Sequence, residues 1–138
     1  MTRLVLDASV TLSWFIDKPP AAYATAIRSH LSRGGTAIVP TIWRLEVANG
    51  FVTAERRGLL NPSRTAELLL ELDVVMRGVE TTQEYPSMRR LLATSRQFGL
   101  TPYDAAYLEL ARDEQVPIAT LDRQLEQAAR QAGISLAQ

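Results

Sequence analysis

The sequence predicts an α/β fold in which a central parallel sheet of four to five short strands is covered by helices on both faces, as a three-layer sandwich. Short apolar runs alternate with segments of helical length along the chain. The apolar runs are continuous, which is typical of strands buried on both faces. No two of them are joined by a short hairpin turn. With 138 residues, 46% of them hydrophobic, the chain suits a single domain spanning residues 1–138.

Each expected element follows from a local pattern. Runs rich in Val, Ile, Leu and Ala predict strands at 3–6, 36–39, 74–80, 116–120 and 134–136. Helical spacing bounded by capping residues, prolines or glycines predicts helices at 8–15, 21–33, 41–57, 61–73, 85–98, 101–111 and 122–132. Ala26 and Ile27 are expected to face inward on the second helix, and Leu91 and Leu92 on the fifth. Thr101 and Pro102 begin a sixth helix that is apolar on nearly all sides and therefore predicted to be buried.

Composition excludes several classes of function. The chain has no cysteine, so it has no disulfide, thiolate zinc site or cysteine nucleophile. The formal net charge is zero, so no overall basic field favours nucleic acid. No signal peptide or membrane-length apolar run is evident, and we expect a cytoplasmic protein without a membrane partner. Lys18 is the only lysine, and the arginines either suit contacts to phosphate or carboxylate or reflect genome composition. His30, the only histidine, is expected at the surface.

Four acidic residues are predicted to meet at one edge of the sheet. Asp7 and Asp122 directly follow predicted strands, Glu46 lies early in the helix after the second strand, and Asp104 is at the third position of the helix capped by Thr101. In parallel α/β sheets the ligand crevice lies beyond the carboxyl ends of the strands. Taken singly, Asp7 and Asp122 could be helix N-caps, and Asp104 part of a capping box.

Neutral oxygen donors accompany these carboxylates in the sequence. Ser9 and Thr120 each lie two residues from an acidic position, and Asn49 lies one helical turn after Glu46. Carboxylates combined with hydroxyl and amide oxygens are hard ligands, which suit Mg²⁺ or Mn²⁺ and not zinc or copper. The pattern therefore indicates a site for divalent-metal-assisted phosphodiester hydrolysis.

Four segments carry a family resemblance. They read Leu4-Val5-Leu6-Asp7-Ala8-Ser9-Val10, Pro40-x-x-Trp43-x-x-Glu46-Val47-x-Asn49, Leu100-Thr101-x-Tyr103-Asp104-Ala105-x-Tyr107-Leu108-x-Leu110-Ala111 and Ala119-Thr120-Leu121-Asp122-x-x-Leu125. Together they resemble PIN-domain ribonucleases, and above all the VapC-type toxins of bacterial toxin–antitoxin pairs. The resemblance runs from residue 3 to about residue 136.

The resemblance implies a toxin that is an Mg²⁺- or Mn²⁺-dependent endoribonuclease, forms a homodimer and is neutralised by a small cognate antitoxin. It assigns catalysis and metal binding to four positions, namely Asp7, Glu46, Asp104 and Asp122. It gives supporting roles to Ser9, Asn49 and Thr120. Contacts to the RNA substrate or to a partner are expected at Arg44, Trp14 and Trp43, with core packing as the alternative for the tryptophans.

Other classes are less consistent with the residues. A phosphorelay receiver needs a lysine late in the chain, and a nucleotide-binding switch needs a glycine-rich loop followed by Lys-Ser or Lys-Thr, and neither is present. A non-catalytic PIN-like module that binds RNA or protein stays open as the alternative, because only a nuclease assay with a metal titration separates it from the enzyme.

Overall fold

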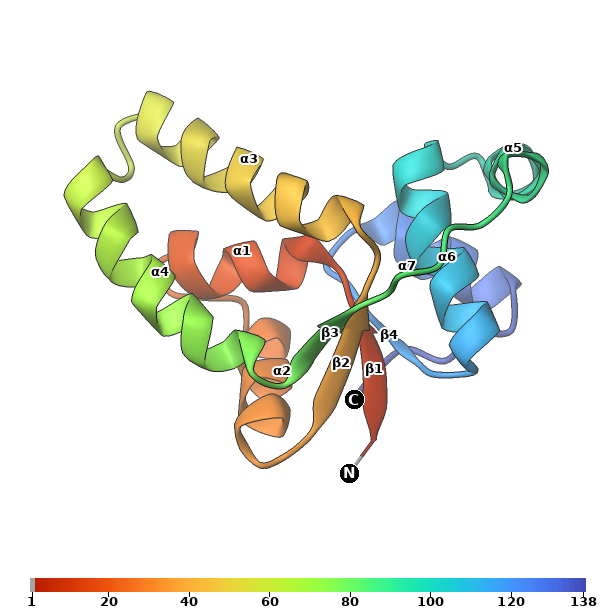
Figure 1. Cartoon of the computed structure of the whole chain (residues 1–138), viewed down its shortest axis with the longest axis horizontal. Helices are drawn as coiled ribbons and strands as arrows, with labels where there is room; N and C mark the ends of the chain where they lie inside the picture. Colours follow the sequence, from red (N-terminus) through yellow and green to blue (C-terminus); the bar gives the residue numbers. More distant parts are fainter. Residues whose placement is uncertain (1) are drawn as a thin grey trace.

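The computed structural model describes residues 2–138 and contains a parallel four-stranded sheet (Figure 1). The strands are β1 (Arg3–Leu6), β2 (Thr36–Val39), β3 (Val79–Thr81) and β4 (Ile118–Ala119), in the spatial order β3-β2-β1-β4. Leu4 pairs with Ala37 of β2, and Val5 pairs with Ile118 of β4. The central position of β1 places its carboxyl end between two neighbouring strands.

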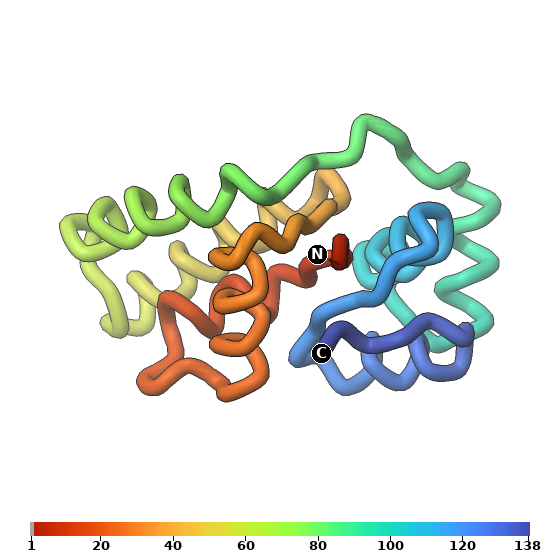
Figure 2. Tube along the Cα trace, turned by 90° about the horizontal axis from the view of Figure 1, so that it is seen from below, coloured from red at the N-terminus to blue at the C-terminus, as the bar shows by residue number. Residues whose placement is uncertain are grey.

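Helices cover both faces of the sheet. The first group comprises α1 (Ala8–Ile16), α2 (Ala22–Ser32), α3 (Ile42–Arg56) and α4 (Pro62–Met76), and the second comprises α5 (Met88–Phe98), α6 (Pro102–Glu114) and α7 (Arg123–Gln131). Figures 1 and 2 show the first group on one side of the sheet and the second group on the other. The predicted three-layer α/β architecture is therefore confirmed.

The burial of the strands explains why their sequences are continuous apolar runs. Val5 and Leu6 of β1 have no exposed side-chain surface, because helices cover both of their faces. On α6, Tyr107 and Leu108 are equally inaccessible. Burying an aliphatic or aromatic side chain of this size contributes about 1.5–3 kcal/mol, so β1 and α6 supply a large part of the core energy.

Local signals set several helix ends as expected. The Asn61 side chain accepts a hydrogen bond from the Arg64 N–H at 2.8 Å, and the Thr101 hydroxyl accepts one from the Asp104 N–H at 3.2 Å. Both are N-cap bonds that satisfy free amides in the first turn. Gly99 ends α5 with a φ of 65°, a conformation that favours glycine.

Three expected element boundaries are wrong. The segment 74–76 is the last turn of α4 and not a strand, since Val74 is exposed and β3 begins only at Val79. The fifth helix begins at Met88 instead of residue 85, because the Ser87 hydroxyl caps it by accepting from the Arg90 N–H. The expected strand at 134–136 is reduced to one bridge between Leu136 and Ile118.

Two side chains expected to face the core do not. Ala26 and Leu92 are exposed, whereas Ile27 is buried as expected. Thr94 is the buried residue of α5, so this helix contacts the rest of the chain through a polar face. No helix within residues 2–138 is long and apolar enough to cross a membrane.

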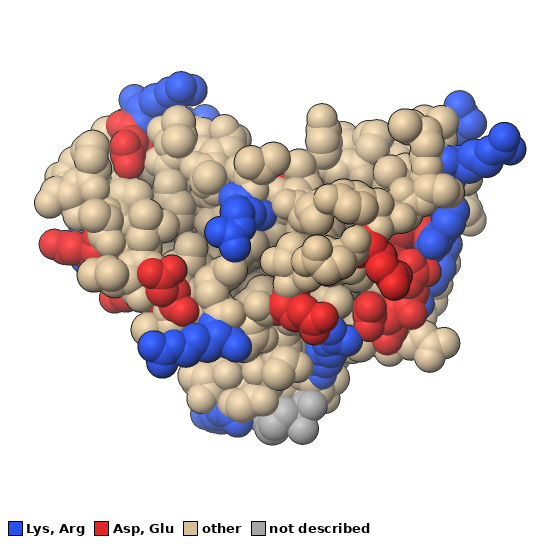
Figure 3. Space-filling view, in the orientation of Figure 1, with Lys and Arg blue, Asp and Glu red and all other residues tan. Residues whose placement is uncertain are grey.

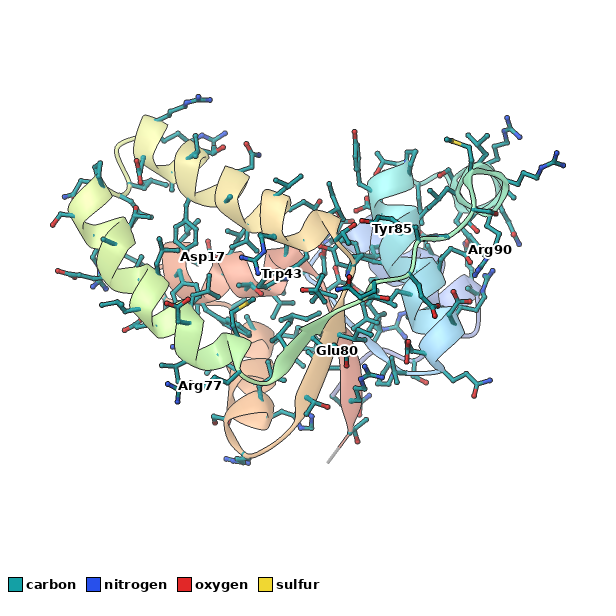
Figure 4. The ribbon with its side chains drawn as sticks, viewed as in Figure 1. Asp17, Trp43, Arg77, Glu80, Tyr85 and Arg90 are labelled. Carbon is teal, nitrogen blue, oxygen red and sulfur yellow. The ribbon has the colours of Figure 1, made fainter. Side chains whose placement is uncertain are left out.

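A buried carboxylate joins α5 to α6. Glu109 is 1% exposed, and it accepts hydrogen bonds from the Arg90 guanidinium and the Thr94 hydroxyl of α5. Arg112 lies 3.3 Å from the same carboxylate, and Arg90 also reaches Asp113 at 2.7 Å. Figure 4 shows Arg90 extending from α5 toward α6. Paired in this way, a buried charge is tolerated, and it fixes the two helices against each other.

We expect Arg90→Met to lower the free energy of unfolding by about 2 kcal/mol, because Glu109 would lose a charged partner while keeping Thr94 and Arg112. Arg89→Met is the matched control, since Arg89 is exposed and lies outside this cluster. It should change stability by less than about 0.5 kcal/mol. Urea denaturation of the three proteins measures the difference, and equal stabilities of the two variants would contradict the role given to Glu109.

Candidate active site

The four acidic residues predicted from the sequence come from four different parts of the fold. Asp7 directly follows β1, Asp122 directly precedes α7, Glu46 lies in the second turn of α3 and Asp104 in the first turn of α6. The parallel pairing of β1 with β4 brings the first two together. The charges of Asp7 and Asp122 act on Asp104, and those of Asp7 and Asp104 act on Glu46. The structure therefore gathers all four carboxylates at one edge of the sheet.

Asp7 is the most buried of the four, with 6% of its surface exposed. Its Oδ2 atom accepts hydrogen bonds from the Ser9 hydroxyl at 2.5 Å and from the Thr120 hydroxyl at 2.8 Å. Burial raises the pKa of Asp7, these two bonds oppose the rise, and the nearby charge of Asp122 adds to it. The Asp7 side chain makes no capping bond to α1, so helix capping does not account for it.

The two hydroxyls also fix the backbone around the site. Ser9 accepts a hydrogen bond from the Leu121 N–H at 3.0 Å, and Thr120 accepts one from the Asp122 N–H at 3.0 Å. Each hydroxyl therefore donates to Asp7 and accepts from the segment between β4 and α7. This pair of bridges holds the beginning of α1 against the beginning of α7.

Asp122 and Asp104 differ in how far helix capping explains them. The Oδ1 atom of Asp122 accepts from the Gln124 N–H at 2.8 Å and the Leu125 N–H at 3.1 Å, so Asp122 does cap α7. Asp104 instead donates its backbone N–H to the capping residue Thr101. Burial and the charges of Asp122 and Asp7 raise the pKa of Asp104 to about 6, against a smaller lowering by the Thr101 hydroxyl.

Glu46 is held from the opposite helix. Its Oε1 atom accepts a hydrogen bond from the Tyr107 hydroxyl of α6 at 2.6 Å. Burial raises the pKa of Glu46, the bond from Tyr107 lowers it, and the charges of Asp7 and Asp104 raise it further. Burial also raises the pKa of Tyr107, so its hydroxyl stays protonated and acts as a donor. The motif over residues 100–111 contains Tyr107 without indicating this contact, although a position one turn after Asp104 places both residues on one face of the helix.

This edge is not neutralised by any Lys or Arg side chain in the part of the chain that the structure describes. Within residues 2–138, no Lys or Arg side chain forms an ion pair with any of the four carboxylates, and Arg44 and Arg123 are both exposed. On the face in Figure 3 the basic side chains lie in separate groups and not in a continuous strip. In the described chain, no three Asp, Glu or His side chains are placed to hold a metal ion together as they stand. Carboxylates repel one another, so this separation is expected when no cation is bound between them.

Comparison with known proteins identifies the family. A family model described as PIN domain matches residues 4–131. The chain belongs to the PIN-domain family. This PIN domain is 29% identical to Ribonuclease VapC3 of Pyrobaculum aerophilum over 123 residues, which make up 89% of the chain and 92% of that relative. Its fold is similar to the crystal structure of PAE2754 from Pyrobaculum aerophilum, with a TM-score of 0.68 and 20% identity over 92% of this chain and 84% of that one.

The remaining candidate residues of the PIN domain fall into two groups. Asn49 and Arg44 are exposed on α3, near Glu46, and their roles stay predictions. Trp14 and Trp43 are buried in the core, and Trp14 donates its indole N–H to the Ala24 carbonyl at 2.6 Å. Figure 4 shows Trp43 on the side of α3 that faces α1. Core packing therefore accounts for both tryptophans, and neither presents a ring face to a base or to a partner.

Acidification should stabilise the PIN domain when it is free of metal. Because the pKa of Asp104 is raised from 3.8 to about 6, the native state binds a proton there at pH values where the unfolded chain does not. The free energy of unfolding should therefore rise as the pH falls from neutral through about 6, and this contribution should level off near 3.8. Asp104→Asn removes the titrating group and should flatten the profile. Urea denaturation in EDTA across this range measures both proteins, and parallel profiles would contradict the prediction.

Proposed function

We propose that this PIN domain is an endoribonuclease that depends on Mg²⁺ or Mn²⁺. The observation that carries the proposal is the group of four carboxylates at one edge of the sheet, whose charges act on one another and which pair with no Lys or Arg side chain within residues 2–138. Such a group destabilises a fold unless a ligand of opposite charge binds there. The similarity to a protein named Ribonuclease VapC3 supports RNA as the substrate.

The donor set fits a hard divalent cation. All four acidic residues supply oxygen atoms, and no cysteine or histidine competes among them. Asp7 and Glu46 would be the best-held ligands, because hydrogen bonds from the Ser9, Thr120 and Tyr107 hydroxyls fix one carboxylate oxygen of each. Asp104 and Asp122 would complete the set.

In the mechanism, hydroxyl groups of the chain orient the carboxylates that would hold the cation. The chemistry that a bound divalent cation supplies is charge stabilisation on the phosphodiester and activation of water. The hydroxyls of Ser9 and Thr120 hold Asp7 in one orientation, and Tyr107 does the same for Glu46. Preorganised ligands of this kind reduce the reorganisation that hydrolysis requires. No nucleophile from the protein is needed.

We further propose that the protein is the toxin of a toxin–antitoxin pair, forms a homodimer and binds a small antitoxin. Large apolar side chains are exposed along α3, α4 and the turn between them, at Leu45, Val52, Leu59, Leu69, Leu70 and Val74. Leu70 is 69% exposed and Leu45 is 67% exposed. Exposed large apolar side chains in this number favour a protein-interaction surface. It replaces the surroundings of Trp14 and Trp43 as the expected partner-binding surface.

Purified protein free of antitoxin should cleave RNA with Mg²⁺ or Mn²⁺ and lose that activity in EDTA.

Asp7→Asn should abolish cleavage, yet in the absence of metal it should melt at the same or a higher temperature than the wild type, because it relieves the repulsion between carboxylates. Mn²⁺ should raise the melting temperature of the wild type much more than that of the variant. Cleavage unaffected by EDTA, or a destabilised but fully active Asp7→Asn protein, would contradict the site. A folded protein that binds RNA and never cleaves it would favour the non-catalytic module.

Co-expression with the small protein encoded beside it should relieve the growth arrest caused by the chain alone, and the two should purify together. Leu70→Glu should weaken that complex at least tenfold, because it would bury a charge in the interface that we assign to α4. It should leave RNA cleavage unchanged, since α4 carries none of the four carboxylates. Growth arrest that persists with the partner present, together with failure to isolate a complex, would contradict the toxin–antitoxin proposal.

A further inference from the structure

The acidic edge is divided between two sides of the molecule. Glu46 belongs to α3 and Asp104 to α6, and these helices lie in the two different helical layers (Figure 1). Within residues 2–138, the bond from the Tyr107 hydroxyl to Glu46 is the only side-chain hydrogen bond or ion pair that joins α3 to α6. This contact is therefore the direct polar link between the helix that carries Glu46 and the helix that carries Asp104.

Tyr107 is well suited to fix that separation. It lies three residues after Asp104 on the same helix, so the helix itself sets its position relative to Asp104. Its side chain is completely buried, which leaves its ring no freedom to follow a moving partner. The hydroxyl reaches Oε1 of Glu46 at 2.6 Å, within the range of a strong bond to a carboxylate.

Packing alone does not account for a tyrosine at this position. Phenylalanine would fill the same volume of the core without bringing a polar hydroxyl out of water. The hydroxyl also points at a half-buried carboxylate that two other carboxylates already repel. The bond therefore holds Glu46 in a place that its charge disfavours.

We propose that Tyr107 is a positioning residue, which holds Glu46 in the orientation in which it would bind a divalent cation together with Asp104. The proposal rests on the proposed function, because it assumes that Glu46 and Asp104 bind one cation. Tyr107 itself touches neither the cation nor RNA. Its contribution is to set the distance and the angle between two ligands carried by different helices.

The first test is the affinity of purified, folded protein for Mn²⁺, measured by calorimetry or by the electron spin resonance of free Mn²⁺. Tyr107→Phe should weaken Mn²⁺ binding about 10- to 100-fold, the usual effect of removing a group that orients a metal ligand. Tyr103→Phe is the matched control, because Tyr103 is on the same helix, is 60% exposed and should bind Mn²⁺ like the wild type. RNA cleavage by Tyr107→Phe should fall at low Mn²⁺ and recover at saturating Mn²⁺.

A double-mutant cycle shows whether Tyr107 acts through Glu46. In a Glu46→Gln background, adding Tyr107→Phe should cause little further loss of Mn²⁺ binding. Glu46→Asp offers a second variant that leaves Tyr107 in place, because the shorter side chain draws the carboxylate away from the hydroxyl. It should weaken Mn²⁺ binding to a similar extent and should also be insensitive to Tyr107→Phe.

Each outcome bears on the proposal. Wild-type affinity in Tyr107→Phe would overturn it and leave the proposed function intact, and so would an equal loss with and without Glu46. Absence of Mn²⁺ binding by the wild type would overturn both this inference and the proposed function. A loss confined to proteins that retain Glu46, reversed by excess Mn²⁺, would support it.

Discussion

The pairing of β1 with β4 is the contact on which the acidic edge depends. It joins residues more than a hundred positions apart and sets Asp7 beside the segment that leads into α7. The register matters for the site, because a shift of one residue between β1 and β4 would move Asp7 away from the Thr120 hydroxyl that now donates to it. Ser9 and Thr120 then extend the pairing beyond the strands through side chains.

The site and the core place opposite demands on the same residues. Apolar burial around Asp7 and Tyr107 stabilises the fold, yet it also removes water from carboxylates that repel one another. The donors that contact these carboxylates are the hydroxyls of Ser9, Thr120 and Tyr107, and not basic side chains. Hydroxyls orient a carboxylate without neutralising it, whereas an arginine would stabilise the protein and occupy the place of a ligand. Glu109, which is buried in the same helix as Tyr107, is instead paired with an arginine, Arg90.

The order of strands and helices and the four acidic positions could be predicted because they depend on local patterns and on a general rule for parallel sheets. The end of α4 was not predicted because Val74 and Val75 favour a strand locally, whereas the helix continues to Met76 and is capped at Arg77. The side chains of Tyr107 and Glu109 bond to partners 61 and 19 residues away, so no local pattern in the sequence indicated these contacts. Trp14 and Trp43 are near the acidic residues in sequence, but their large apolar side chains are buried in the core.

The single bridge between Leu136 and Ile118 has a bearing on how copies of this protein can meet. Ala137 also donates its N–H to the Ile118 carbonyl at 2.8 Å, so the chain end occupies the outer side of β4. At the opposite margin, β3 is only three residues long and carries Glu80. Short, charged or covered margins discourage the addition of a strand from another molecule. A sheet that continues from one subunit into another is therefore disfavoured, and copies of this protein would associate through the surfaces of their helices.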